Sequence, residues 1–298
     1  LQPARSLSDM SITASDETSG MQARRPTDAA GWRLEDIEFA AIDQTLARES
    51  EAIVHLLIAS SFIESGTHLY AKNLAAHFDG DHEVSTWLSQ QWEPEELQHG
   101  RALRAYVACV WPTFDWDRAH AGFIEVYRPL CTMGKLEPRR GLEMAARCVV
   151  ETGTTSLYRA IHQQVREPVL RTLLRHISED EVRHYKHFLR YFRKYQQQER
   201  SSRANVLGAL VRRSAEISRE DTDIGLRHAH AERCQSAASD LTFDELRRAV
   251  RAHVSAGAPI DLASAMWLRP LQLAPFAERQ ARRLFTLAGR TAVACQRS

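Results

Sequence analysis

Two stretches of the sequence place a glutamate three residues before a histidine. WEPEELQHG contains Glu96 and His99, and DEVRH contains Glu181 and His184. On an α-helix, side chains at i and i+3 leave the same side with their Cβ atoms about 5–6 Å apart, so that one pair can bind one ion. A single Glu-x-x-His unit carries little information, because charged helix surfaces often contain one.

Both units lie where helical periodicity predicts a buried face. The apolar stripe around the first unit runs through Leu88, Trp92, Leu103 and Val107, and the stripe around the second runs through Leu170, Leu174, Ile177, Phe188 and Tyr191. An ionised carboxylate that is buried without a partner is very costly, so each glutamate needs positive charge beside it. The pattern therefore favours buried carboxylates with a cationic partner over a salt-bridged helix surface.

Each unit is preceded, at a similar distance along the chain, by one more glutamate in an apolar segment. Glu64 stands in IASSFIES, and Glu151 stands in ARCVVETGTTSLY. Four carboxylates and two imidazoles directed into a four-helix core are the ligand set of a dinuclear carboxylate site. Oxygen-rich ligation with one imidazole per metal suits iron, with manganese as the alternative, better than zinc or copper. We therefore predict two iron ions held by Glu64, Glu96, His99, Glu151, Glu181 and His184.

The ligand types also suggest roles. We expect the glutamates of the two Glu-x-x-His units to bridge the metals, and the two upstream glutamates to bind one metal each. A histidine that binds a metal through one ring nitrogen needs an acceptor for the other. Glu95 and Asp180, one residue before each bridging glutamate, are candidates for that acceptor, and a solvated carboxylate is the alternative for both.

The elements that must position these residues are predicted to be helices. Apolar periodicity indicates helices at residues 34–77, 82–111, 117–131, 139–166 and 168–197, and no alternating strand of useful length is present. Pro94 falls inside the second helix and should kink it just before Glu96. The sequence thus predicts an all-α protein with a four-helix core.

Composition divides the chain into three parts. Residues 1–33 have almost no apolar periodicity and are predicted to be disordered. Residues 34–198 form the predicted helical bundle. Residues 199–298 are more polar and contain shorter helices, which we expect to form a C-terminal extension, either an appendage or helices packed on the outside of the bundle.

The charge balance and the cysteines limit the partners and the compartment. The chain of 298 residues has 39 Lys and Arg against 38 Asp and Glu, so nothing in its overall charge suggests a nucleic acid or an anionic membrane as a partner. The longest apolar run, at residues 52–63, is too short to span a bilayer. Five cysteines without a CxxC pair are typical of reduced thiols, and no secretory signal is recognisable, so we expect a cytoplasmic protein.

The two Glu-x-x-His stretches resemble those of a known family, the soluble acyl-acyl-carrier-protein desaturases. WEPEELQHG resembles their W-x-x-E-E-x-x-H-G stretch, and DEVRH resembles their D-E-x-R-H stretch. Glu64 and Glu151 stand where these enzymes have their two other ligands, and Thr154 matches a threonine beside their oxygen site. The resemblance covers about residues 34–198.

The resemblance implies a ferritin-like bundle with a di-iron centre and an oxygen-dependent oxidoreductase. The substrates would be O2 and an acyl or similar aliphatic chain, free or bound to an acyl carrier protein. The resemblance also implies an external electron donor such as a ferredoxin, and we expect a homodimer. Desaturation, hydroxylation and N-oxidation begin in the same way, and the sequence leaves them open. Similar N-oxygenases can carry an extra histidine at the position of Ile177, which argues against that branch.

A protein that only handles iron is the alternative function. Storage ferritins share the ligands but end soon after the fourth helix, whereas this chain continues for about 100 residues, which favours an enzyme. A ferroxidase or a non-catalytic relative remains the rival, and a substrate cavity beside the metals would distinguish the enzyme from it.

Three further features have two interpretations each. The Thr154 hydroxyl is either a catalytic group at the oxygen site or bonded back to its own helix. His68, one turn after Glu64, is either a seventh ligand or a hydrogen-bonded histidine outside the site, and the complete ligand set favours the second. The basic residues of segment 183–194 are either a solvated helix face or a docking surface for an acidic carrier or electron donor.

Overall fold

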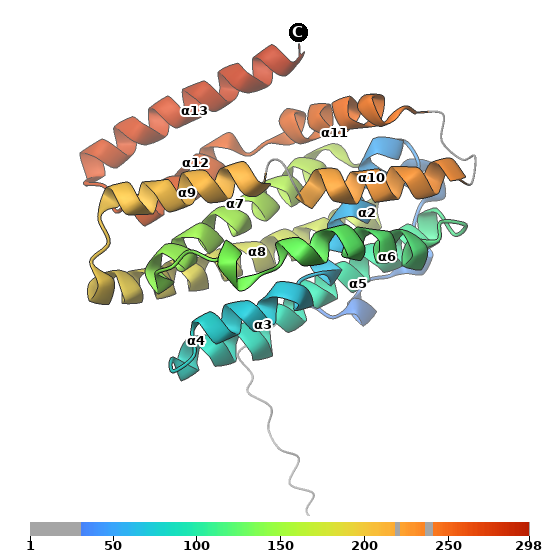
Figure 1. The fold of residues 1–298 in the computed structure, drawn as a ribbon. Coiled ribbons are helices and arrows are strands. Elements are labelled where there is room, and N and C mark those ends of the chain that lie inside the picture. Colours follow the sequence, from blue (N-terminus) through green and yellow to red (C-terminus); the bar gives the residue numbers. More distant parts are fainter. Residues whose placement is uncertain (1–30, 218–220, 236–240, 298) are drawn as a thin grey trace, which may run out of the picture. The chain divides into compact units, whose positions relative to one another are not determined.

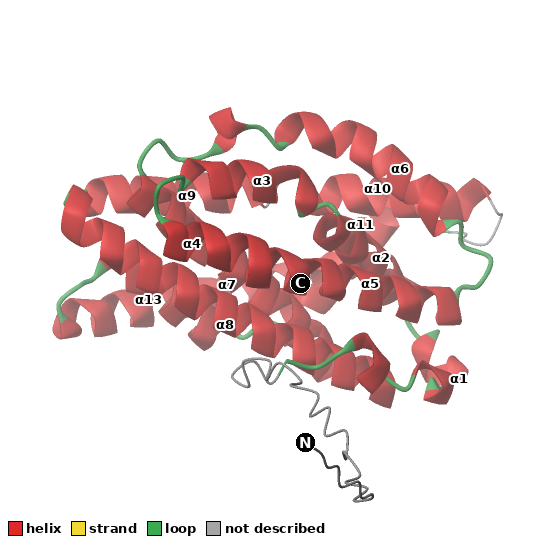
Figure 2. Cartoon of the chain, turned by 90° about the horizontal axis from the view of Figure 1, so that it is seen from below, coloured by secondary structure: helices red, strands yellow, loops and turns green. Residues whose placement is uncertain are grey.

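The regular elements that the structure describes are all helices. The computed structural model describes residues 31–217, 221–235 and 241–297, and within these ranges helices are joined only by turns and loops (Figures 1 and 2). The predicted all-α class is confirmed.

Four long helices form the centre of the bundle: α2 (Glu51–Ser65), α5 (Glu93–Val110), α7 (Arg140–Gln164) and α8 (Pro168–Glu199). Helix α2 packs along α5, α7 packs along α8, and α5 also contacts α8. Their facing sides are apolar, and the predicted ligands interrupt these apolar sides. The four helices on which the ligand prediction depends therefore pack together.

The predicted helix at residues 34–77 is wrong as a single element. The structure divides it into η1 (Leu34–Asp36), η2 (Phe39–Ala41), α1 (Gln44–Ala47), α2 and α3 (His68–His77). Asp43 and Ser50 accept hydrogen bonds from the first backbone N–H groups of α1 and α2, so each begins a new helix. The axes of α2 and α3 differ by 43° across residues 66–67. Local capping thus overrides the continuous apolar pattern.

The predicted helix at residues 82–111 is present but contains a wide turn. Helix α4 (His82–Trp87) passes through the π-helical segment η3 (Leu88–Trp92) into α5, and the Glu93 N–H bonds to the Leu88 carbonyl. Proline removes one helical hydrogen bond and crowds the preceding turn, and a π turn is one way to absorb that disruption. A π turn thus ends two residues before Pro94 and one turn before the first Glu-x-x-His unit, while the kink expected at Pro94 stays a prediction.

The remaining predicted helices of the bundle agree with the structure to within a few residues. The segment predicted at 117–131 is α6 (Trp116–Tyr127) followed by η4 (Arg128–Leu130), with η5 (Met133–Lys135) next along the chain. The segments predicted at 139–166 and 168–197 are α7 and α8. Glu167 caps α8 by accepting the N–H groups of Val169 and Leu170.

The C-terminal helices pack on the outside of the bundle. They are α9 (Arg203–Ile217), α10 (Asp221–Gln235), α11 (Phe243–Gly257), α12 (Ile260–Leu268), η6 (Arg269–Leu271) and α13 (Pro275–Arg297). Helices α9, α11 and α12 contact α7, α10 contacts α2 and α6, and α13 lies against α12 and α11 (Figure 1). Of the two arrangements left open for this part of the chain, the structure has packed helices rather than an appendage.

The boundary predicted at residue 33 for a disordered segment needs correction. Residues 1–30 lie outside the described part of the chain. Trp32, however, is only 8% exposed and belongs to the hydrophobic core. The packed body of the described residues therefore includes Trp32, which the predicted boundary had placed in the disordered segment.

In the described residues no single helix is long and apolar enough to cross a membrane. The pair α2 and α3 satisfies the length and composition criterion only when both helices are taken together across their bend.

The approach of α5 to α2 depends on a glycine beside the first histidine of the site. A Cβ added at Gly100 would lie 2.8 Å from the backbone nitrogen of Ser65, next to Glu64. We expect Gly100→Ala to force the two helices apart and to lower the free energy of unfolding by about 1–3 kcal/mol. Urea denaturation monitored by circular dichroism measures this, with Gly153→Ala as the control because an added Cβ there meets nothing within 4 Å. Equal stability of the two variants would contradict the close contact.

Candidate metal centre

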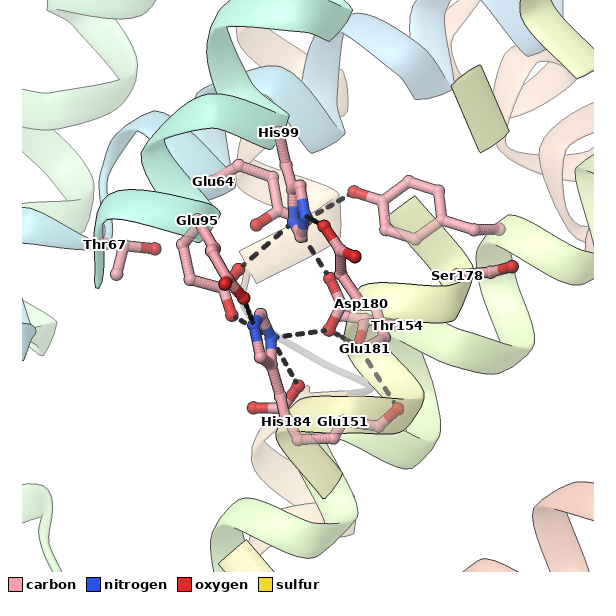
Figure 3. Close-up of polar contacts among 12 residues, drawn as sticks. Glu64, Thr67, Glu95, His99, Glu151, Thr154, Ser178, Asp180, Glu181 and His184 are labelled. Carbon is pink, nitrogen blue, oxygen red and sulfur yellow. Dashed lines mark hydrogen bonds and ion pairs between the residues drawn. The ribbon is translucent and has the colours of Figure 1, made fainter. Parts of the chain in front are cut away.

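The structure brings the six predicted ligands into one buried cluster. Glu64 comes from the end of α2, Glu151 from the middle of α7, and the two Glu-x-x-His units from α5 and α8. Each of the six residues is at most 5% exposed. Figure 3 shows both imidazoles directed among the carboxylates, with dashed lines that mark the contacts between them.

The cluster divides into two groups with two members in common. Glu64, Glu96, His99 and Glu181 form one group, and Glu96, Glu151, Glu181 and His184 form the other. Within each group, one potential ligand atom per residue lies within 4.8 Å of the others. The glutamates expected to bridge belong to both groups, and the upstream glutamates belong to one group each. Each group could hold a metal ion.

Both histidines direct the same ring nitrogen towards the shared carboxylates. His99 Nδ1 lies 3.3 Å from Glu181 Oε1 and 3.7 Å from Glu96 Oε2. His184 Nδ1 lies 3.1 Å from Glu96 Oε1 and 3.8 Å from Glu151 Oε2. One imidazole thus serves each group, as a dinuclear carboxylate site requires.

Several atoms of the cluster have no hydrogen-bond partner among the described residues, although they are fully buried. They are His99 Nδ1, Glu151 Oε2, Glu181 Oε1 and His184 Nδ1. A buried polar atom without a partner is costly, and four such atoms in one place call for a shared ligand. Because the atoms are carboxylate oxygens and imidazole nitrogens, a cation satisfies all of them. The residues present therefore fit a bound metal.

The outward nitrogens of the two histidines are held by carboxylates on the opposite helix. His99 Nε2 donates to Asp180 Oδ2 at 3.0 Å, and His184 Nε2 donates to Glu95 Oε2 at 2.7 Å. Glu95 and Asp180 were the predicted acceptors, and these contacts confirm that role over that of solvated carboxylates. Because each acceptor sits on the helix opposite its histidine, the pairs also fix the orientation of α5 relative to α8.

Arg183 connects these two carboxylates. Its Nη1 bonds to Asp180 Oδ1 at 2.6 Å, and its Nη2 bonds to Glu95 Oε2 at 3.0 Å. Sequence reasoning assigned Arg183 to a basic helix face and missed this role. Its position between Glu181 and His184 in DEVRH was the available signal.

Trp32 completes the surroundings of His99. Its indole N–H donates to Asp180 Oδ2 at 2.9 Å, and its ring stacks parallel to that of His99 at 6.2 Å between centroids. Nothing in the sequence near Trp32 indicates this contact, because 148 positions separate it from Asp180.

Burial and like charge set the protonation of the cluster. Burial, reinforced by the charges of neighbouring glutamates, raises the pKa of Glu64 and of Glu151 well above the usual range. Burial would also raise the pKa of Glu96, but the close imidazoles of His184 and His99 outweigh it and hold that pKa well below its usual value. Protons therefore neutralise part of the carboxylate charge when no metal does so.

The histidines gain protons for the same reason. Burial lowers the pKa of an imidazole, but the neighbouring carboxylates outweigh it in both cases. Asp180, Glu181 and Glu96 hold the pKa of His99 well above its usual value. Glu95 and Glu96 raise the pKa of His184 to about 9. A metal ion would take the place of these protons.

Thr154 and Tyr158 connect the cluster to α7. The Thr154 hydroxyl donates to Glu181 Oε2 at 2.8 Å and also lies 3.3 Å from the carbonyls of Val150 and Glu151. The predicted bond back to its own helix is thus present, and the hydroxyl also contacts a predicted ligand, while its catalytic role stays a prediction. The Tyr158 hydroxyl donates to Glu64 Oε1, a contact that the sequence did not predict although Tyr158 is two turns from Glu151 on the same face.

The other candidates lie outside the cluster. His68 is exposed, and its Nδ1 bonds to the Ser65 carbonyl, so the interpretation as a histidine outside the site is the one that agrees with the structure. In the basic segment 183–194, Arg190 pairs with Glu83, and Lys194 pairs with Asp81 and Glu83. These side chains mainly hold α8 against α4.

A cavity of about 760 Å³ reaches the cluster. Glu64, Thr154 and Tyr158 line its inner part, and Gly153 contributes to the same wall. Apolar side chains from α2, α7 and α11 cover much of the remaining surface, including Leu56, Ile63, Leu157, Val250 and Val254. The lining also includes charged side chains, among them Arg147, Arg213, Arg247 and Arg251. A cavity with apolar walls and converging polar groups is the usual form of a small-molecule site.

Comparisons with known proteins add no relative. No family model matches this chain, and no curated protein and no solved structure matches it. The functional argument therefore depends on the residues and their geometry.

Proposed function

We propose that this protein is a ferritin-like di-iron oxidoreductase that uses O2 to oxidise an aliphatic substrate. The observation that carries the proposal is the meeting of the carboxylate–imidazole cluster with the apolar cavity at Glu64 and Thr154. A protein that only handles iron needs the cluster but has no use for a cavity of about 760 Å³ beside it. The ligand set suits both iron and manganese. Iron is preferred because O2 activation needs a readily oxidised metal.

The proposed reaction balances with an external reductant of the ferredoxin class. Reduced iron would supply the capacity to activate O2. In a hydroxylation, the substrate C–H bond becomes C–OH, and the second oxygen atom leaves as water after the donor delivers two electrons and the solvent delivers two protons. In a desaturation, two C–H bonds are lost, and both oxygen atoms leave as water with the same two electrons and two protons.

The protein's own groups position the reactants. Glu95, Asp180 and Arg183 fix the two histidines, and Trp32 covers His99. Apolar cavity walls exclude water from the substrate. The Thr154 hydroxyl lies at the boundary between cavity and cluster and can hold a proton there.

Oxygen consumption tests the proposal. The iron-loaded, chemically reduced protein is mixed with a panel of free acids, amides and carrier-bound acyl chains, and oxygen uptake is followed with an electrode. We expect at least one aliphatic compound to accelerate uptake and to yield an oxidised product by mass spectrometry. If no compound accelerates uptake and iron is instead oxidised and retained in excess of two ions per chain, the iron-handling alternative takes its place.

Thr154→Val separates the chemistry from the fold. Valine replaces the hydroxyl with a methyl group of nearly equal volume, so we expect unchanged metal content and a melting temperature close to that of the wild type. Product formation should slow about 10–100-fold, or more of the oxygen should appear as peroxide, because the proton-holding group is lost. Ser156→Ala removes a hydroxyl from the same cavity that bonds only to its own helix, and should leave turnover unchanged. Wild-type rate and coupling in Thr154→Val would exclude a role for this hydroxyl.

A further inference from the structure

A buried arginine faces the cavity one helical turn before Glu151, one of the predicted metal ligands. Arg147 on α7 is 5% exposed and lines the same cavity as Thr154. Its Nε donates to Glu143 Oε1 at 2.9 Å, and its guanidinium lies 5.1 Å from the centre of the Tyr70 ring. A charged side chain in an apolar interior is costly unless its donors are matched.

The donors of Arg147 are only partly matched. No described residue hydrogen-bonds its terminal nitrogens, Nη1 and Nη2, which form the fork that arginine normally presents to a carboxylate. Its one partner is shared, since Glu143 also accepts from Arg213 Nη2 at 3.3 Å and from the Glu137 backbone N–H at 2.8 Å. The fork of Arg147 thus lacks a partner at a place where the cavity provides room for one.

The distance between Arg147 and Thr154 indicates how far a ligand bound to Arg147 must extend. Arg147 and Thr154 are seven residues apart on one helix, which corresponds to about 10 Å along its axis. Val150 lies between them on the cavity wall, and Ile63 and Leu157 add apolar surface near Thr154. A ligand that pairs with Arg147 can therefore extend an apolar chain past Thr154 and Glu64.

We propose that the cavity binds a free aliphatic carboxylate, with its carboxylate on Arg147 and its chain along α7. The inference rests on the proposed function and names its substrate class. A carboxylate matches the open fork of one guanidinium with two parallel hydrogen bonds. A thioester on a carrier protein has no charge that could pair with Arg147. A phosphate monoester carries about two negative charges, which is more than one buried cation can balance. The carbon presented to the metal centre is then several bonds from the carboxylate.

Binding of decanoate and of decanamide tests the proposal. The two molecules have the same chain and nearly the same shape, but only decanoate carries a charge. Isothermal titration calorimetry on the metal-loaded wild-type protein should show decanoate binding at least tenfold more tightly than decanamide, because charge-assisted hydrogen bonds are about twice as strong as neutral ones. Equal affinities, or no binding of decanoate, would overturn the proposal without any variant.

Three arginine variants locate the residue that distinguishes decanoate from decanamide. Arg147→Gln should bring the decanoate affinity down to that of decanamide, while Arg251→Gln, at an exposed position on the rim of the same cavity, should leave the preference intact. Loss of the preference in Arg251→Gln but not in Arg147→Gln would place the carboxylate elsewhere. Arg147→Lys keeps the charge without the fork and should retain part of the preference.

Oxygen uptake separates this inference from the proposed function. If decanoate and decanamide accelerate uptake equally, the oxidase chemistry stands and the carboxylate site fails. If decanoate binds through Arg147 but no carboxylate of any length accelerates uptake, the site stands as a binding site and the proposed oxidation fails.

Discussion

Glu96→Ala is expected to lower the bound iron from about two ions per chain to one or none. Glu96 belongs to both groups of potential ligands, and His184 Nδ1 lies 3.1 Å from its Oε1. Loss of a carboxylate shared by both groups would remove one negative charge in total. It would also remove one potential ligand oxygen from each group. Elemental analysis of the iron-loaded and desalted protein measures the result.

Two companion variants make the metal experiment decisive. Glu181→Ala should show the same loss, because Glu181 is the other member shared by both groups. Glu93→Ala lies one turn earlier on α5, outside both groups, and should retain full metal content. Full metal content in both Glu96→Ala and Glu181→Ala would contradict the assignment of the centre.

Removal of the metal is expected to lower the melting temperature, and this decrease in melting temperature should become larger between pH 7 and pH 9. A ligand that binds only the folded state stabilises it, by about 2.7 kcal/mol when its concentration is 100 times Kd. Metal binding requires deprotonated ligands, so metal affinity rises with pH in this range. Thermal melts of iron-loaded and chelator-treated protein at several pH values measure the difference.

The protonation of the cluster makes the stability of the metal-free protein change with pH in the direction opposite to the metal affinity. The pKa values of Glu64, Glu151, His99 and His184 are all raised in the folded state. A group with a raised pKa stabilises the fold below its unfolded pKa, and this contribution is lost as the pH rises through the folded value, which is about 9 for His184. Glu96, whose pKa is lowered, loses its contribution only in acid and changes nothing in this window. The stability of the metal-free protein should therefore fall from pH 7 to pH 9.

The control is a variant with weakened metal binding. Glu96→Ala should show a smaller difference between the melting temperatures with and without chelator than the wild type at each pH. Identical melting curves of the loaded and chelated wild type at neutral pH would count against a preformed buried site.

The sequence by itself determined the residues of the centre and the helices that carry them. Helical periodicity is local, so the spacing of Glu96 from His99 and of Glu181 from His184 was sufficient to place each pair on one face. The cost of burying a carboxylate then required a shared cation, and the need of each histidine for an acceptor pointed to Glu95 and Asp180.

Only the tertiary structure decided how these helices contact one another. Three contacts depend on how helices pack across the core: the exchange of acceptors between α5 and α8, the bridge by Arg183, and the contact of Trp32 with Asp180. Periodicity within one helix does not indicate how that helix packs against others. The same holds for the cavity, whose walls come from α2, α7, α10 and α11, and for the unmatched fork of Arg147. The break of the predicted helix at 34–77 is different, because it follows from local caps at Asp43 and Ser50 that interrupt a continuous apolar pattern. Local spacing thus predicts the residues of the candidate metal centre, and long-range packing determines the contacts and the cavity that surround them.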